Sequence, residues 1–376
     1  MPETTRKLAS VRRISAINPI PGADAIEVAT VGGWKVVVKK GEYRVGDLAV
    51  YYEIDSFLPE RPEFEFLRKS SFKKDHTGRG GFRLRTIKLR GQVSQGLLTP
   101  VYQDAYEADP EDESKPNYVN MIDSPTGPVV VQEGDDVTSW LGVTKWDPPV
   151  PAQLAGKVKG NFPSRLRKTD EERVQNLDYQ ELLTMRSNSG PFGIYSEWYA
   201  AEKLDGSSMT CYLLDGEFGV CSRNLDLKET EGNTFWQVAR AEKIEEKMRD
   251  VAAEFGGDAG WNFAVQGELI GPGIQGNPYK LAQPTFRLFN VIDVDGGMPR
   301  LPFRHLRDVA VIGGFVSVPV LDKHFDLPDA IEDLIASADG PSVLNAQTKR
   351  EGLVIRSHDG EVSFKVISNA FLLKQR

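Results

Sequence analysis

The first half of the chain is patterned for β-strands. The segments AIEVATV and WKVVVKK alternate apolar and polar residues on either side of Gly32-Gly33, a pair that favours a two-residue hairpin turn. Further strand-like runs follow at short intervals, at 47–54, 82–90, 96–101 and 128–137. About five short strands separated by turn residues are typical of an OB-fold. We therefore expect an OB-like β-barrel in this half.

One of these runs combines strand periodicity with positive charge. Basic residues stand between most of its apolar positions, which are Phe82, Leu84, Ile87 and Leu89. A strand of this kind packs one face and exposes the other, which here would carry cations. The wider segment 68–90 contains nine Lys or Arg against one acid, Asp75. This local charge predicts a surface that follows phosphates, with nucleic acid bound by Arg83, Arg85 and Lys88. A solvated, strongly charged hairpin is the alternative.

Two further segments suggest how the chain is divided. The acidic stretch 103–127 interrupts the strand pattern and is predicted to be a surface insertion. The proline-containing stretch DPPVPAQLAGKVKGN, 147–161, resists both helix and sheet and predicts a linker. We therefore expect an OB-fold nucleic-acid-binding domain at 1–150, a linker at 151–166 and a second domain at 167–376.

The second half mixes helical and strand patterns. Residues 234–255 place their apolar positions near one helical face, and Gly256-Gly257 are expected to end that helix. The segment KTDEERVQNL predicts another helix, opened by a capping box from Thr169 to Glu172. Short apolar runs predict strands at 210–214, 218–222, 262–269, 286–294, 352–356 and 361–366. The fold class is therefore α+β, with a mixed α/β domain after the barrel.

Composition narrows the class of protein. The chain has 376 residues, a net charge of −8, two cysteines and four histidines. Two cysteines do not form a disulfide-stapled fold, and the histidines lack the spacing of zinc ligands. Neither an apolar leader at the start nor a membrane-length apolar run is visible. We expect a cytoplasmic protein that acts as a monomer away from membranes.

A series of charged and aromatic residues recurs along the second half. The segments that carry it are, in order, EKLDG, SRN, VQGELIGPGIQGNPY, RLFNVIDV, EGLVIR and VSFKVIS. Each segment alone is a weak signal. The order lysine, arginine, glutamate, aromatic residue, glutamate, lysine over residues 203–365 resembles the covalent nucleotidyltransferases, the superfamily of ligases and capping enzymes.

The layout narrows this resemblance. A β-rich segment precedes these motifs, and eleven residues follow Lys365, so no OB domain is expected after them. With PIPGADAIEVATVGGWKVVVKKG, RTIKLRGQVSQGLL and KTDEERVQN, the chain resembles the ATP-dependent RNA ligases of the Deinococcus type over nearly its whole length. The superfamily often has a second lysine in its last motif, but here Ser363 and Ile367 flank Lys365 at a spacing of two, and that lysine is left unassigned.

The resemblance implies an RNA ligase with an ATP-grasp-like ligase domain at 167–376. A lysine would attack the α-phosphate of ATP, pass AMP to a 5′-phosphate, and allow a 3′-hydroxyl to seal the strands of RNA or an RNA-containing duplex, in the repair of nicks or breaks. The implied catalytic residues are Lys203, Arg223, Glu351 and Lys365. The implied nucleotide-binding residues are Glu202, Lys203, Asn224, Glu268, Phe289 and Lys365. The GPGIQG stretch lacks the ending of a P-loop and is expected to shape the substrate side of the site.

A divalent cation follows from the chemistry of the lysine. Only the neutral amine is nucleophilic, whereas nearby carboxylates favour the ammonium form. A metal held by Asp205, Glu268 and Glu351 reverses this local field, through bound water if the ion is Mg²⁺. We therefore expect ATP with Mg²⁺ or Mn²⁺, and we expect Gly206 to let the backbone approach the nucleotide.

Two other functions share parts of this pattern. A GTP-dependent guanylyltransferase of the capping type would use the same lysine chemistry. A non-catalytic RNA-binding protein with a degenerate transferase domain would retain the basic barrel. The presence of Lys203, Glu268, Glu351 and Lys365 argues against degeneration.

Overall fold

The computed structural model describes residues 7–75, 78–109, 112–146, 156–167, 171–187, 198–256 and 260–374. The chain divides into two compact units, Met1–Val150 and Pro151–Gln375. Each unit has its own hydrophobic core.

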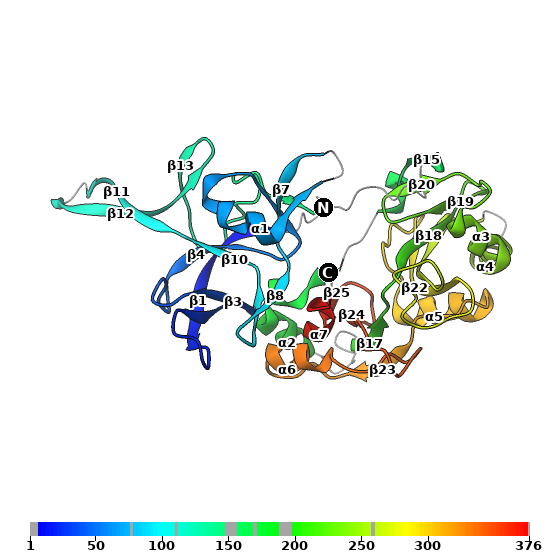
Figure 1. Cartoon of the computed structure of the whole chain (residues 1–376). Helices are drawn as coiled ribbons and strands as arrows, with labels where there is room; N and C mark the ends of the chain where they lie inside the picture. Colours follow the sequence, from blue (N-terminus) through cyan, green and yellow to red (C-terminus); the bar gives the residue numbers. More distant parts are fainter. Residues whose placement is uncertain are drawn as a thin grey trace. The chain divides into compact units, whose positions relative to one another are not determined.

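The first unit is built on a five-stranded antiparallel sheet. Its order is β10-β4-β1-β2-β3, with bounds Leu97–Pro100, Leu48–Tyr52, Ala9–Pro19, Ile26–Val31 and Trp34–Lys39 (Figure 1). Strand β1 pairs with β4 up to Arg13 and with β2 from Ile14 onward, across an irregularity between Ile14 and Ala16. Such a bulge lets a long strand bend between two partners, as a small barrel requires. The hairpin predicted at Gly32-Gly33 joins β2 to β3 and is confirmed.

The run from Phe82 to Arg90 is two strands rather than one. Strand β7, Gly80–Arg83, belongs to a sheet of order β14-β5-β7-β6, whose other strands are Thr144–Lys145, Ser56–Pro59 and Phe72–Lys74. Strand β8, Thr86–Leu89, pairs only with β9, Gln92–Gln95. Consequently Phe82 and Leu84 are buried, whereas Ile87 and Leu89 are 45% and 39% exposed. The expectation that all four share one packed face is wrong.

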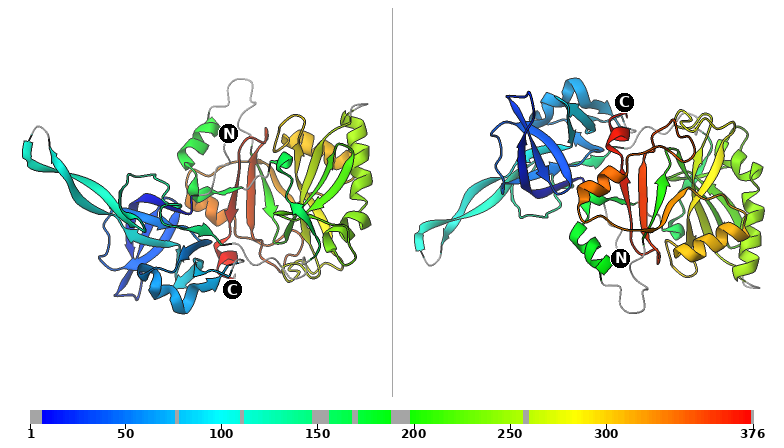
Figure 2. Two further views of the ribbon diagram at one scale, coloured as in Figure 1. Left: turned by 90° about the horizontal axis from the view of Figure 1, so that it is seen from above. Right: turned by 90° about the horizontal axis from the view of Figure 1, so that it is seen from below.

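The acidic stretch forms an arm. Strand β11, Tyr102–Asp109, pairs with β12, Asp112–Ser124, and β12 pairs with β13, Gly127–Val130. Figure 2 shows this arm extending from the rest of its unit. The predicted insertion is therefore present. The first part of the run 128–137 belongs to β13 of the arm, whereas its last residues run beside β1, with an antiparallel bridge from Asp136 to Ser10 and a hydrogen bond from Val137 N to Ala9 O.

The second unit contains two sheets. The larger has the order β15-β20-β19-β18-β21-β22, with bounds Val158–Asn161, Leu225–Leu227, Glu217–Cys221, Ser207–Leu214, Phe263–Ile270 and Thr285–Asp293. The smaller has the order β16-β25-β24-β17-β23, with bounds Glu172–Arg173, Ser363–Ile367, Gly352–Ser357, Trp198–Lys203 and Val320–Phe325. All six strands predicted in this half are present.

Helices cover these sheets. Helices α3, Thr234–Ala241, α4, Ile244–Gly256, and α5, Phe303–Ile312, pack on the larger sheet through one apolar core (Figure 1). Helices α2, Tyr179–Ser187, and α6, Ile331–Ser337, share a core with the smaller sheet. Short helices also occur at Arg68–Ser71 (α1) and Asn369–Leu372 (α7).

The helix expected at 234–255 is interrupted. Glu242 and Lys243 separate α3 from α4, and Lys243 has a left-handed backbone with φ of 55°. The Glu242 side chain accepts hydrogen bonds from Phe286 N and Thr285 Oγ1, which ties the break to β22. The predicted end of the helix at Gly256 is correct.

Two other predictions in this half need correction. Thr169 lies outside the described residues, but Glu172 and Arg173 form β16 and Val174–Asn176 a 3-10 turn, so the capping box does not open a helix. Residues 147–155 of the predicted linker are likewise outside the described residues, while its end, Val158–Asn161, is paired with β20. In both segments, pairing with a neighbouring strand outweighs the local sequence pattern, which was a capping box before β16 and a run of prolines before β15.

Within the described residues, no helix is long and apolar enough to cross a membrane.

Candidate active site

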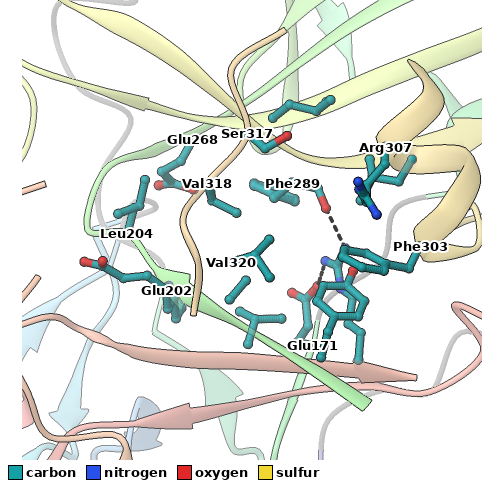
Figure 3. A pocket seen from close by; sticks show the side chains of 17 residues that line it. Glu171, Glu202, Leu204, Glu268, Phe289, Phe303, Arg307, Ser317, Val318 and Val320 are labelled. Carbon is teal, nitrogen blue, oxygen red and sulfur yellow. Dashed lines mark hydrogen bonds and ion pairs between the residues drawn. The ribbon is translucent and has the colours of Figure 1, made fainter. Parts of the chain in front are cut away.

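The two sheets of the second unit enclose a cavity of about 110 Å³. Strands β17 and β24 of the smaller sheet contribute Lys203, Val354 and Arg356, and strands β21 and β22 of the larger sheet contribute Glu268 and Phe289. Figure 3 shows Phe289, Glu202 and Glu268 around the cavity, with Phe303 and Arg307 of α5 beside it. The motif residues of four strands therefore meet in one place.

Lys203 is the last residue of β17 and forms an ion pair with Glu351. Lys203 Nζ lies 2.8 Å from Glu351 Oε1, and the two side chains are 27% and 13% exposed. The register of the sheet produces this contact, because Lys203 pairs with Gly352, the first residue of β24. Strand pairing thus brings together two residues that are far apart in the sequence.

The charges around Lys203 affect one another strongly. Burial lowers the pKa of Lys203, but Glu351 and Glu268 outweigh this effect and raise it above its ordinary value. Burial raises the pKa of Glu268 to about 8, with Glu351 and Asp205 adding to the rise. The pKa of Asp205 is raised to about 6 by burial and by Glu351. The site therefore holds more carboxylate charge than one ammonium group can neutralise.

The turn after Lys203 is held against β21. A Cβ atom at Gly206 would lie 2.5 Å from Leu269 O and 2.8 Å from Glu268 Cγ. Gly206 therefore permits a close approach to the protein's own β21, which brings Glu268 toward Lys203. Asp205 N, in the same turn, donates a hydrogen bond of 2.6 Å to the hydroxyl of Tyr279.

Glu202 is almost fully buried beside the cavity. Its Oε2 atom accepts a hydrogen bond of 2.8 Å from Val343 N. Its Oε1 atom is buried and has no hydrogen-bond partner among the described residues. A buried carboxylate oxygen of this kind is suited to accept a hydrogen bond from an amino group of a ligand.

Arg356, which the sequence analysis missed, holds the backbone of Phe289 beside the cavity. Arg356 Nη1 donates to Phe289 O at 2.6 Å, and its Nη2 lies 2.6 Å from Glu171 Oε1. The Arg356 side chain is 5% exposed and also donates to Ser363 Oγ at 2.9 Å. The sequence could have indicated that Arg356 faces the site, because alternation along EGLVIR places it on the same strand face as Val354.

The last motif shows why no second lysine stands beside Lys365. Ser363, two residues before it, accepts the Arg356 hydrogen bond, and Ile367, two residues after it, is buried. Both positions are therefore used by the fold.

Several predicted residues lie outside the cavity lining. Arg223 and Asn224 are exposed in the connection from β19 to β20, and Arg223 lowers the pKa of Glu268 electrostatically. Lys365 lies on β25, where it pairs with Val354 and with Arg173 of β16. Arg83 in the first unit forms an ion pair with Asp55 at 3.4 Å.

The donor set suits a hydrated cation. No three His, Cys, Asp or Glu side chains in the part of the chain described here are grouped closely enough to hold a metal ion directly. Glu351 nevertheless raises the pKa of both Asp205 and Glu268, and it forms an ion pair with Lys203. Oxygen ligands with unneutralised charge are what Mg²⁺ and Mn²⁺ prefer, and Mg²⁺ commonly keeps its water shell. The carboxylates therefore fit a cation that contacts them through water.

Comparisons with known proteins agree in both units. Residues 8–101 match a family model described as an OB-fold domain, and residues 196–367 match one described as RNA ligase. A structure of Naegleria gruberi RNA ligase with pyrophosphate is 41% identical, with 99% of each chain covered and a TM-score of 0.78. An apo variant of that ligase is 40% identical, with 98% of each chain covered and a TM-score of 0.79. Another variant, with ATP and Mn, is 40% identical over 98% of this chain and 99% of that one, with a TM-score of 0.78. Among curated proteins, no match is found.

Proposed function

The chain belongs to the ATP-dependent RNA ligases, and from this premise we propose that Lys203 is the residue that carries AMP. The observation that supports this assignment most directly is the position of its amine, at the end of strand β17, 2.8 Å from Glu351 and beside a cavity lined by an aromatic ring and a buried carboxylate. A lysine so placed can reach a phosphate whose nucleoside occupies the cavity.

The first step needs the neutral amine. Lys203 Nζ loses a proton to solvent and attacks the α-phosphorus of ATP, and the bond from that phosphorus to the bridging oxygen breaks as pyrophosphate leaves. Arg223 and Lys365 are proposed to offset the negative charge that develops on the phosphate. Asp205, Glu268 and Glu351 would hold a divalent cation through water, and its positive charge would favour the neutral lysine and stabilise the phosphate oxygens.

The cavity is proposed to hold adenosine. Phe289 offers a ring face for stacking, with Val354 also lining the space. Glu202 Oε1 is suited to accept a hydrogen bond from the exocyclic amino group of adenine. Guanine carries a carbonyl oxygen at that position, which a carboxylate repels, so this feature favours ATP over the GTP of capping enzymes. Asn224 is proposed to contact the ribose of ATP or the RNA substrate.

The later steps need RNA ends. A 5′-phosphate oxygen attacks the lysine-bound AMP and frees Lys203, and a 3′-hydroxyl then attacks that 5′-phosphorus and expels AMP. We assign the chemistry to residues 167–376 and the grip on RNA to residues 1–150, with 151–166 between them. The cations that support this grip are Arg85, Lys88 and Arg90 on hairpin β8–β9, because no ion pair is found for them among the described residues, whereas Arg83 is paired with Asp55.

The redox setting of the two cysteines fits a cytoplasmic enzyme. Cys211 and Cys221 are both buried and unbridged. Free buried thiols are ordinary in a reducing compartment.

Covalent labelling tests the assignment of Lys203. The protein is incubated with α-labelled ATP and Mg²⁺ or Mn²⁺, and the label is followed on a denaturing gel. Label is expected on the wild-type protein, on Lys228→Ala as an exposed-lysine control, and not on Lys203→Ala. Label that persists on Lys203→Ala would overturn the assignment, and stronger label from GTP than from ATP would favour the capping-type function.

A further inference from the structure

A long loop joins two strands that could be joined by a tight turn. Strands β21 and β22 are antiparallel neighbours, yet residues 271–284 lie between them. Antiparallel neighbours are usually connected by about two to five residues. Three successive turns fold the loop, closed by hydrogen bonds from Ile274 N to Gly271 O, Asn277 N to Ile274 O and Lys280 N to Asn277 O.

The loop holds an unusual backbone. Left-handed φ angles occur at three residues that are not glycine, namely Gln275 (44°), Asn277 (49°) and Lys280 (55°). Such conformations are sparsely populated and persist where surrounding contacts hold them. The contacts of Asn277 do so locally, because its side chain both accepts from Leu281 N and donates to Leu281 O.

One side of the loop contacts the turn that follows Lys203. Tyr279 is 4% exposed, and its hydroxyl accepts the 2.6 Å hydrogen bond from Asp205 N. Gln275 Nε2 donates to Gly206 O at 3.3 Å. Both backbone groups lie within three residues of the nucleophile.

The other side of the loop contacts the segment that leads to Glu351. Pro278 O accepts hydrogen bonds from Asn345 Nδ2 at 3.0 Å and Thr348 Oγ1 at 2.8 Å. Lys280 Nζ donates to Gln347 Oε1 at 2.9 Å. The loop therefore connects the backbone next to Lys203 with the backbone that precedes its ion-pair partner.

We infer that Tyr279 is a positioning residue for formation of the lysine–AMP bond: its hydroxyl fixes the Asp205 turn and thereby the aim of Lys203. This inference rests on the proposed role of Lys203. In-line attack on phosphorus needs the amine within a narrow range of positions, and a displacement of about 1 Å can cost on the order of 100-fold in rate. Without the hydroxyl, Asp205 N has no acceptor on Tyr279, and the turn is no longer tied to a buried side chain of the loop.

Because the reaction has separate steps, a residue that positions Lys203 can be distinguished from a residue that only stabilises the fold. Transfer of AMP to the enzyme requires Lys203, whereas sealing of an RNA strand that already carries AMP on its 5′-phosphate does not. A residue that only aims Lys203 should affect the first measurement and spare the second. A residue that merely supports the fold should affect both.

The full-length Tyr279→Phe variant is tested in both assays. Under single turnover, we expect lysine–AMP formation to slow by at least about 10-fold with little change in the ATP concentration that gives half the maximal rate, while sealing of pre-adenylylated RNA stays within about 3-fold of wild type. The matched control is Tyr212→Phe, which removes a hydroxyl that donates to Asp226 in the same unit. It should leave both rates unchanged.

Two more variants keep the outcome decisive. Gln275→Ala removes the hydrogen bond to Gly206 O without touching the core, and about a 3-fold decrease confined to lysine–AMP formation is expected even if Tyr279→Phe folds poorly. Equal decreases in both assays, or none in the first, would overturn the inference. Lys203→Ala separates this failure from that of the proposed function, because label on Lys203→Ala would refute the nucleophile itself.

Discussion

Lys203 Nζ and Glu351 Oε1 lie 2.8 Å apart, so the amine that we propose as the nucleophile is paired with a carboxylate. The pair keeps Lys203 protonated, since Glu351 and Glu268 raise its pKa more than burial lowers it. A cation that competes with Lys203 for Glu351 would therefore favour the neutral amine as well as bind the phosphate, as we propose.

Replacing Glu351 should reveal its effect on the pKa of Lys203 and its proposed role in holding the cation. We expect Glu351→Gln to reduce the maximal rate of lysine–AMP formation by roughly 100-fold, because the proposed cation loses one of the three carboxylates that hold it beside the phosphate. The same change removes the group that raises the pKa of Lys203, so the rate should reach its plateau at lower pH than in the wild type. Single-turnover labelling from about pH 6 to about pH 10 measures both. A profile that moves to higher pH would contradict this account of the ion pair.

Glu268 should make the protein without metal less stable in base. Its pKa in the folded protein is about 8, against an ordinary value of 4.5. A carboxyl with a raised pKa contributes stability below its unfolded pKa, and this contribution is lost as pH rises through the folded pKa. We therefore expect stability in EDTA to fall between about pH 5 and about pH 8, and Glu268→Gln to be more stable than wild type at pH 8 by on the order of 1 kcal/mol.

Denaturant unfolding at the two pH values measures this difference. Glu217→Gln, at an exposed position of β19, is the control and should follow the wild-type curve. Addition of Mg²⁺ or Mn²⁺ should stabilise the wild type more at about pH 8 than at about pH 6, because a cation binds the ionised carboxylates. A Glu268→Gln variant that is less stable than wild type at the higher pH would show that the ionised Glu268 carboxylate does not destabilise the folded protein.

The buried pair of Arg356 and Glu171 should be costly to break. Burial alone raises the pKa of Glu171, but Arg356 and Arg300 outweigh it and lower the pKa to about 2, so this carboxylate stabilises the fold at pH values above about 4.5 and the effect is lost as pH falls toward 2. Glu171→Ala leaves the Arg356 charge buried, and a destabilisation of about 3 kcal/mol is expected near neutral pH. Because Arg356 also holds Phe289 O, the half-saturating ATP concentration should rise as well.

An exposed ion pair provides the comparison. Arg165 and Asp215 also lie 2.6 Å apart, but their side chains are 47% and 70% exposed. Asp215→Ala should leave the free energy of unfolding nearly unchanged and ATP use unaltered. Similar destabilisation by Glu171→Ala and Asp215→Ala would mean that burial does not govern the strength of the Arg356 pair.

Much of the site could be predicted because its residues lie on strands with clear alternation. Glu268 and Phe289 each stand on a run that predicts a strand, and the order of the motifs indicated that these strands share one site. The strand that ends at Lys203, β17, was not predicted. The OB-fold and the ligase fold expected from the sequence are confirmed by the family models. Assignment of roles within the site stays a prediction.

What the sequence did not reveal depends on long-range partners. Glu171 and Arg356 are 185 residues apart, and no local pattern pairs them. Strand β15 was not predicted because prolines precede it in the sequence, but its pairing with β20 forms the strand. The change of partner between β7 and β8 occurs at Leu84, whose backbone still pairs with Ser56 and Asp55 before the chain leaves that sheet. Alternation of apolar residues continues through this point, so the pattern alone could not show it.

That change of partner places a hairpin in the first unit whose tip, residues 87–91, is exposed. Strands β8 and β9 are joined by Arg90 and Gly91, both left-handed, and Val37 N donates to Ser94 Oγ at the base. Arg85, Lys88 and Arg90 lie on this hairpin, and the last two are exposed. A hairpin that carries cations at its tip is suited to contact a phosphate backbone.

Neutralising this hairpin should weaken RNA sealing without affecting lysine–AMP formation. In full-length protein, the combined Arg85→Gln, Lys88→Gln and Arg90→Gln changes should leave ATP labelling at the wild-type level, because that step needs no RNA. RNA affinity should fall, and the slope of its logarithm against the logarithm of salt concentration should decrease by up to about 3, one for each phosphate that is no longer neutralised. The matched control neutralises Lys39, Lys40 and Arg44, three exposed cations elsewhere in the same unit, and should leave that slope nearly unchanged. Equal effects of the two triple variants would mean that net charge, and not this hairpin, attracts the RNA.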